Sequence, residues 1–211
     1  MTPAPAPITT VIFDYAGTLA LPPPEEEKRR LEHVAGVEPE AFWDAFWAER
    51  PRYNTTGDAP TFWTGVQRAT GARWTPEQHH ELWALDMRSN LLANVPVLRA
   101  ARRVARLGLR TVLFSDCPPD LAAILRRSPA LAAFEDLYFS CDLGATKSSP
   151  GLFRTVLEGL GATAGQCLFI DDGDSNVQTA ATLGMRAHRY TDGARLDRFL
   201  SEQLAGYPPN G

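Results

Sequence analysis

The hydrophobic pattern from residue 91 onward alternates between helical spacing and short apolar runs. Apolar residues that recur every three or four positions predict helices, whereas short continuous apolar runs bounded by turn residues are typical of buried strands. This alternation predicts strands at 110–114, 137–140, 167–170 and 186–189, and helices at 97–107, 118–127, 150–160, 175–183 and 194–204. Repeated strand–helix units favour a parallel sheet with helices on both faces.

Another apolar run, residues 8–13, stops at Asp14. It is rich in β-branched residues and predicts one more buried strand. We expect this strand to join the same sheet, because the polar groups that would complement Asp14 lie far downstream. The predicted architecture is therefore α/β, a doubly wound parallel sheet of Rossmann-like type, formed by residues 1–19 and 91–211.

The stretch 20–90 has a different pattern, with all five tryptophans and no convincing strand. Phe42, Trp43, Phe46 and Trp47 fall on one face of a predicted helix, which is more typical of core than of a ligand site. We therefore expect residues 20–90 to form a helical insertion folded on its own small core.

Composition narrows the function classes. The chain has 211 residues, 44% of them hydrophobic, and a formal net charge of −4, which suits one α/β domain with a small insertion. It has no basic stripe that would favour nucleic acid, and no apolar stretch near the roughly 20 residues of a membrane span. Three cysteines without a C-x-x-C pair fit a reducing cytoplasm, where we expect a monomer or homodimer. Residues 1–7 are proline-rich, lack the features of a signal peptide and predict a disordered leader.

Polar residues follow three of the predicted strands. Asp14 ends the first run, Ser115 the second, and Asp171 with Asp172 ends the run that begins at Cys167. The carboxyl ends of parallel strands line the ligand crevice of an open α/β sheet. A carboxylate buried there is costly unless it is paired or holds a metal, so Asp14 is predicted to be a ligand, a nucleophile or both.

These strand ends and two later stretches resemble the motifs of the haloacid dehalogenase superfamily. The matching segments, in the family's order, are Asp14-Tyr15-Ala16-Gly17-Thr18, Leu113-Phe114-Ser115, Lys147 before Ser148-Ser149-Pro150, and Asp171-Asp172 with Asn176. The similarity spans roughly residues 8–190 and implies that the insertion at 20–90 is a helical cap. It also implies a Mg²⁺-dependent hydrolase that acts on a small phosphorylated metabolite through an aspartyl nucleophile.

The resemblance implies catalytic roles for four residues. Asp14 would attack phosphorus, and Lys147 would pair with the nucleophile and with phosphate oxygens. Ser115 would donate its hydroxyl to a phosphoryl oxygen. Thr18 would orient the turn after the first strand and hydrogen-bond the nucleophile, with Gly17 supporting that turn.

The resemblance also implies a metal site. Mg²⁺ prefers oxygen ligands, and the expected ligands are Asp14, Asp172 and the backbone carbonyl of Ala16. Asp171 would either bind the metal as well or support the residues that do. Asn176 would anchor the acidic loop. A backbone carbonyl survives any change of side chain, so metal binding should tolerate Ala16.

Ala16 is the departure from the family pattern. The usual phosphatase motif is D-x-D-G-T, and its second Asp protonates the leaving group and then activates water, which is typically worth about 10²–10⁴-fold. One reading is a hydrolase whose leaving group needs little protonation, or whose acid comes from the cap or the substrate. A second is a phosphonoacetaldehyde hydrolase-like enzyme, which carries D-x-A-G-T and needs a cap lysine, for which Lys28 is the one candidate. A third is a pseudoenzyme that binds a phosphorylated ligand or a protein.

A dehalogenase-like hydrolase is a fourth reading. Haloacid dehalogenases proper carry an aromatic residue at the position of Ala16 and need no metal. Tyr15 stands one place too early, and a strand sends neighbouring side chains to opposite sides. The acidic pair Asp171-Asp172 also favours metal over halide chemistry.

The insertion would set the substrate. Arg50 and Arg52 fall in the polar stretch 49–57, a predicted loop between apolar helices, and would bind a second anionic group unless the loop is simply solvated. Asp116, next to Ser115, would contact substrate or only bind backbone in its turn.

Overall fold

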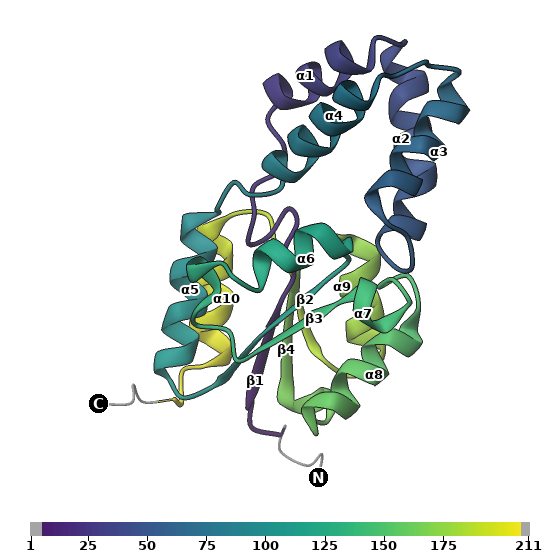
Figure 1. Ribbon diagram of the computed structural model, residues 1–211. Coiled ribbons are helices and arrows are strands. Elements are labelled where there is room, and N and C mark those ends of the chain that lie inside the picture. The colour runs from purple at the N-terminus through teal and green to yellow at the C-terminus, as the bar shows by residue number, and fades with distance from the viewer. Residues whose placement is uncertain (1–5, 208–211) are drawn as a thin grey trace.

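The computed structural model describes residues 6–207 and centres on five parallel strands (Figure 1). In sheet order they are β3 (Asp136–Phe139), β2 (Arg110–Ser115), β1 (Thr10–Phe13), β4 (Cys167–Asp171) and β5 (Arg186–Arg189). The predicted doubly wound α/β class is confirmed, and the strand expected from the start of the chain is the middle of the sheet. Residues 1–5 of the predicted leader lie outside the described residues.

Ten α-helices connect and cover the strands within residues 6–207. Four of them follow β1 in the chain: α1 (Glu25–Ala35), α2 (Pro39–Tyr53), α3 (Ala59–Thr70) and α4 (Pro76–Ser89). The others are α5 (Val95–Arg106), α6 (Pro119–Leu125), α7 (Ser140–Leu143), α8 (Pro150–Leu160), α9 (Asp174–Thr182) and α10 (Gly193–Gln203).

The two faces of the sheet bury different helices, as period-2 alternation along a strand requires. Phe13 of β1 packs in one cluster with side chains of α5, α6 and α10, whereas Ile12 points the other way into a cluster with side chains of α8 and α9. Figure 1 shows the same layering, with α5 and α10 on one side of the sheet and α8 and α9 on the other. Every residue of β1 is buried, because this central strand is covered on both faces.

Helices α1 to α4 form the helical insertion, residues 25–89, which stands over the carboxyl ends of the strands (Figure 1). Its core is separate from those of the sheet and is rich in aromatic rings, among them Phe42, Phe46, Tyr53, Phe62 and Trp63. Tyr53 stacks on Phe62 with ring centroids 4.6 Å apart. Large aromatic side chains bury enough apolar area to hold such a small core together.

Two features of the insertion differ from the sequence-based expectation. The stretch 49–57 is not all loop, because α2 continues through Pro51 to Tyr53. A proline in the last turn removes one intrahelical hydrogen bond, and the burial of Tyr53 compensates for it. The predicted aromatic face is also split, since Phe42 and Phe46 are buried while Trp47 is 60% exposed.

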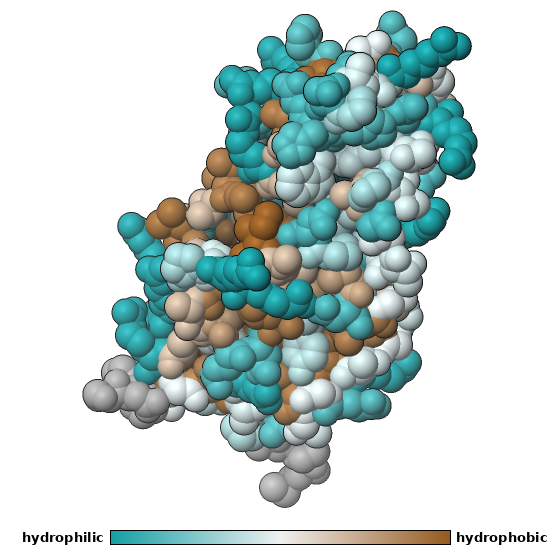
Figure 2. Space-filling view, in the orientation of Figure 1, coloured by the Kyte–Doolittle hydropathy of each residue, from teal (hydrophilic) through white to brown (hydrophobic). Residues whose placement is uncertain are grey.

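The segments that join the insertion to the sheet have an apolar surface. Figure 2 shows apolar side chains gathered at the junction between the insertion and the sheet. The exposed large apolar residues include Leu21, Leu91 and Leu92 of the two connecting segments, and Val95 at the start of α5. No helix within residues 6–207 is both long and apolar enough to cross a membrane.

Candidate active site

Asp14 lies directly after β1, in the middle of the sheet's carboxyl edge. Its backbone N–H donates to the carbonyl of Ile170 at 2.8 Å, which ties the end of β1 to the end of β4. The residue is only 4% exposed. Its carboxylate is therefore fixed beside the polar end of β4 and shielded from water.

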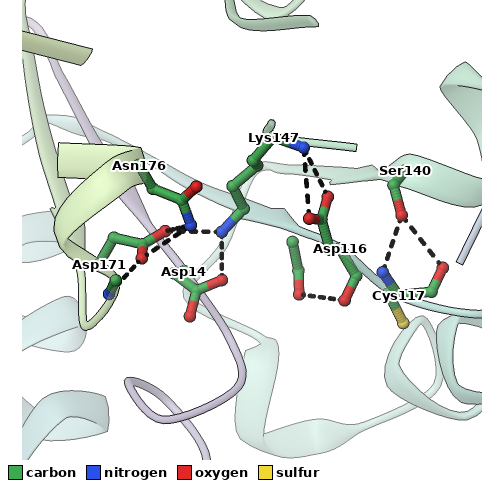
Figure 3. Close-up of polar contacts among 9 residues, drawn as sticks. Asp14, Asp116, Cys117, Ser140, Lys147, Asp171 and Asn176 are labelled. Carbon is green, nitrogen blue, oxygen red and sulfur yellow. Dashed lines mark hydrogen bonds and ion pairs between the residues drawn. The ribbon is translucent and has the colours of Figure 1, made fainter. Parts of the chain in front are cut away.

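Lys147 is the cation that compensates this burial. Its ammonium group donates to both Asp14 and Asp171, at 2.7 Å in the second case, and the residue is 2% exposed (Figure 3). It also lies over the rings of Phe114 and Phe169, 5.4 and 5.8 Å from their centroids. A lysine is seldom buried this completely unless it is paired, so a specific local structure must hold it there.

That local structure is supplied by Asp116. The loop before α8 carries Lys147, and the backbone N–H of Lys147 donates to Oδ1 of Asp116 at 2.9 Å (Figure 3). The backbone contact expected for Asp116 is therefore formed, and its contact with substrate stays a prediction because Asp116 also lines the cavity described below. The loop after β2 thereby positions the loop that bears the lysine.

The acidic loop after β4 divides its two carboxylates between different environments. Asp171 is fully buried and accepts hydrogen bonds from the N–H of Gly173 at 2.8 Å and from Nδ2 of Asn176 at 3.1 and 3.2 Å. Asn176, at the start of α9, thus holds the acidic loop in place (Figure 3). Asp172 is exposed and faces Gly17.

The donor set at this edge suits a divalent cation. Asp14, Asp171 and Asp172 each offer a carboxylate oxygen, and these oxygens lie within 4.8 Å of one another. Oxygen ligands about 2.1 Å from Mg²⁺ in an octahedron are about 3–4 Å apart, so small adjustments bring these carboxylates to such a site. With all three carboxylates ionised and Lys147 protonated, the cluster has a net charge of −2. A divalent cation neutralises this charge, whereas a monovalent cation does not.

Electrostatics supports the same conclusion. Burial raises the pKa of Asp14 to about 7, with Asp171 and Asp172 adding to the rise and Lys147 opposing it. Burial alone lowers the pKa of Lys147, but Asp14 and Asp171 outweigh it and hold that pKa above its usual value. Burial likewise raises the pKa of Asp172, and Asp171 raises it further. The crowded carboxylates are thus short of positive charge.

The remaining motif residues lie around this centre with different partners. Ser115 is buried at the end of β2 and donates to the carbonyl of Asp116 at 3.3 Å. Thr18 is buried, but its Oγ1 has no hydrogen-bond partner within residues 6–207, so the hydrogen bond to Asp14 expected from the sequence is not formed here. Ala16 is exposed at the rim of a cavity.

The cavity lies between the carboxyl edge of the sheet and the helical insertion and has a volume of about 340 Å³. Ala16 and Asp116 line its sheet side, and Trp47 and Arg50 line its helical side. Arg52, which was expected beside Arg50 at a substrate group, is exposed and lines a different depression with Glu49, because α2 stays helical and turns the two side chains apart.

Three polar residues at the boundary of the insertion were not identified from the sequence. Asp120 of α6 accepts from the hydroxyl of Tyr53 at 2.8 Å and from Nε1 of Trp83 at 3.1 Å, so it links two insertion helices to the sheet domain. Asp86 and Asn54 line the cavity. The sequence signal that marks Asp86 is its position as an acid within the apolar stretch Leu82 to Met87.

Comparisons of the sequence with known proteins agree with each other. Residues 8–184 match the family model of haloacid dehalogenase-like hydrolases. The chain is 24% identical over 198 residues to bifunctional epoxide hydrolase 2 of Rattus norvegicus, a match that covers 82% of this chain and 34% of that protein. The chain therefore spans about a third of the length of this curated relative.

Solved structures share the fold. A haloacid dehalogenase family enzyme from Bacteroides thetaiotaomicron, in complex with magnesium and inorganic phosphate, gives a TM-score of 0.70 at 20% identity and covers 90% of this chain and 98% of its own. The L-2-haloacid dehalogenase of Xanthobacter autotrophicus, with chloropropionic acid covalently bound, gives a TM-score of 0.65 at 18% identity. The match covers 96% of this chain and 85% of the dehalogenase.

Proposed function

This chain belongs to the haloacid dehalogenase-like hydrolase family, and we propose that it is a Mg²⁺-dependent hydrolase of a small phosphorylated metabolite with Asp14 as the nucleophile. The observation that carries the proposal is the meeting of Asp14, Asp171 and Asp172 around Lys147 at one edge of the sheet. These groups come from distant parts of the chain. Such a concentration of buried charge is costly, and a reaction that needs it explains why it is present.

The chain's own residues divide the work. A carboxylate oxygen of Asp14 forms a bond to phosphorus while the ester P–O bond breaks, and the alcohol leaves with the electron pair and takes up a proton. Lys147 lowers the pKa of Asp14 against the effect of burial and offers positive charge to the phosphoryl oxygens, and Ser115 offers a hydroxyl. Water then cleaves the aspartyl phosphate and releases phosphate and Asp14.

The metal expectation rests on the carboxylates. Asp14 and Asp172 would hold Mg²⁺, with Asp171 close by, and the bound ion would neutralise the charge of the phosphoryl group as it meets the nucleophile. The related enzyme from Bacteroides thetaiotaomicron was solved with magnesium and phosphate, which is consistent with this metal and this class of substrate.

Ala16 limits the leaving groups that the enzyme accepts. A methyl side chain donates no proton, so esters with good leaving groups, or substrates that bring their own acid, would react fastest. The helical insertion acts as a cap in this proposal, because residues of α1, α2 and α4 line the far side of the cavity that adjoins Ala16.

The test is turnover of 4-nitrophenyl phosphate and a panel of phosphorylated metabolites, phosphonates and haloacids, with Mg²⁺ or with EDTA. Phosphate release that requires Mg²⁺ and is abolished in Asp14→Asn is expected. Asp44→Asn, which changes an exposed acid on α2, is the matched control and should keep full activity. Equal phosphate release in Asp14→Asn would refute the proposal, and metal-independent release of halide would favour a dehalogenase-like hydrolase.

A phosphonatase-like hydrolase is the second candidate, because Lys28 lines the same cavity as Ala16. That chemistry needs a free amine to form a Schiff base, whereas Lys28 is half-exposed and ion-paired with Glu25 at 2.6 Å. Borohydride reduction in the presence of phosphonoacetaldehyde should covalently label the wild type but not Lys28→Arg if this candidate holds. The absence of label leaves the phosphatase proposal as the better account.

A further inference from the structure

Two residues that line the cavity above Ala16 carry buried side-chain acceptors that have no partner within residues 6–207. Asp86 of α4 is 2% exposed and lines the cavity. Its Oδ1 accepts from Nη2 of Arg50 at 2.7 Å and from Nδ2 of Asn90 at 3.3 Å. Its Oδ2 is buried and has no partner within residues 6–207. Buried polar atoms almost always have partners, so this oxygen calls for an explanation.

A second residue in the cavity lining also has an orphan acceptor. Asn54 also lines the cavity, and its Oδ1 is buried without a partner within the described chain. The backbone N–H of Asn54 donates to the carbonyl of Arg50 at 2.8 Å, so the two residues are one helical turn apart at the end of α2. Asp86 and Asn54 therefore flank Arg50 from two different helices of the insertion.

Charge decides which ligand group suits these acceptors. Arg50 is already neutralised by Asp86, and its guanidinium carbon lies 4.2 Å from the ring centroid of Phe46. A second anion would meet the carboxylate of Asp86 and the carbonyl oxygen of Asn54, both of which repel it. The sequence-based expectation that Arg50 and Arg52 bind an anionic group therefore does not fit this cavity.

We propose that the cavity binds the leaving group of the substrate through a neutral hydroxyl that donates a hydrogen bond to Asp86 or Asn54. The walls beside these acceptors include Trp43, Phe46 and Trp47, which suit an apolar or aromatic body. The substrate class is thus a phosphomonoester whose alcohol carries a second hydroxyl group away from the phosphate. This inference rests on the proposed function, because the phosphate is placed by Asp14.

The experiment compares aryl phosphates whose leaving groups are almost equally acidic. The pair is 4-methylphenyl phosphate and 4-(hydroxymethyl)phenyl phosphate, repeated with the 3-substituted isomers to vary the reach of the hydroxyl. A hydrogen bond to a charged acceptor predicts that kcat/KM is at least about tenfold higher for one hydroxymethyl isomer than for its methyl partner. A 4-(aminomethyl)phenyl phosphate arm tests whether a cation is preferred, which would overturn the neutral hydroxyl.

Two variants test the acceptors themselves. Asp86→Asn keeps an oxygen for Arg50 but turns the unpartnered acceptor into an N–H₂ donor. The hydroxymethyl preference should disappear in this variant if Asp86 is the acceptor. Asn54→Leu should reduce the preference without touching the ion pair. Asp44→Asn, an exposed acid on α2, should leave it unchanged. A preference that survives in both Asp86→Asn and Asn54→Leu would overturn the inference.

A binding measurement separates this inference from the proposed function. The free phenols, 4-methylphenol and 4-(hydroxymethyl)phenol, are titrated into the full chain, and the indole N–H signals of Trp43 and Trp47 are followed by NMR. Tighter binding of the hydroxymethyl compound supports the hydroxyl subsite even if no phosphate ester is hydrolysed. Equal or weaker binding overturns it, whether or not 4-nitrophenyl phosphate is turned over.

Discussion

Gly17 and Asp172 are so close that no side chain fits between them. A Cβ atom on Gly17 would lie 2.6 Å from Cγ of Asp172 and closer still to Oδ2. Gly17 also has a φ of 77°, a conformation that residues with a Cβ atom rarely adopt. The turn after β1 can therefore approach the acidic loop after β4 only because this position has no side chain.

We expect Gly17→Ala to lose Mg²⁺ binding and activity beyond any loss of stability. The positive φ alone should cost about 1–2 kcal/mol, and the overlap should also push Asp172 away from Asp14. Gly36→Ala is the matched control, since Gly36 has a φ of 61° but open space around its missing Cβ. Isothermal titration with Mg²⁺ and thermal unfolding of both variants measure the difference. An unchanged Mg²⁺ affinity in Gly17→Ala would show that Asp172 is not a ligand.

Lys147 should be a determinant of stability as well as of catalysis. Lys147→Met leaves Asp14 and Asp171 buried without their cation, and breaking a buried pair in this way typically costs about 3–5 kcal/mol. Lys28→Met, which breaks an exposed pair with Glu25, should cost less than about 1 kcal/mol. Urea unfolding in EDTA measures both.

A double variant distinguishes charge from packing at Lys147. Asp14→Asn combined with Lys147→Met removes the unpaired nucleophile carboxylate and should recover part of the lost stability. Strictly additive destabilisation would mean that Lys147 stabilises the protein by packing on Phe114 and Phe169 instead of by its charge.

A further prediction concerns pH and lies away from the site. Burial lowers the pKa of His188, which stacks on Phe199 at 4.5 Å and whose Nε2 has no partner within residues 6–207. The folded state therefore binds fewer protons than the unfolded state, so this residue's contribution is fully present above about pH 6.5 and is lost as the pH falls below it. His188→Gln should flatten the stability profile between pH 5 and about 7. The exposed His33→Gln should not, and equal profiles for the two variants would argue against the assignment.

The sequence predicts the sheet and its polar edge well, for a physical reason. Each buried strand is a continuous apolar run, so Asp14, Ser115 and Asp171 are marked as the points where the runs end. Parallel strands bring those ends together, and the structure places all three at one edge. At this edge, the residues that the sequence marks as strand ends are also the residues that the fold brings together.

Other parts of the site depend on packing that no local pattern records. Arg50 of another helix binds one oxygen of Asp86, and the other oxygen is buried without a partner within residues 6–207. The continuation of α2 past Pro51 depends on the burial of Tyr53 against Phe62. In both cases the deciding partner is distant in the sequence or compensates an unfavourable local residue.

Ala16 offers a direct test of the chemistry, because it is exposed at the cavity rim and a longer side chain has room to enter. If only acid–base help is missing, Ala16→Asp should raise kcat/KM on alkyl phosphates, whose leaving groups need a proton. The gain should lie at the low end of the about 10²–10⁴-fold typical of general acid–base catalysis, because the cavity did not develop around that carboxylate. The gain should be smaller on 4-nitrophenyl phosphate, whose leaving group needs no proton. It should be absent in Ala16→Asn, which introduces a side chain of the same shape as Asp without the acid. Unchanged or lower activity on every ester, in a variant that unfolds at the wild-type temperature, would mean that Ala16 belongs to a different reaction. Lys28, in the same cavity, would then become the residue to test, and the phosphonatase-like candidate would replace the phosphatase.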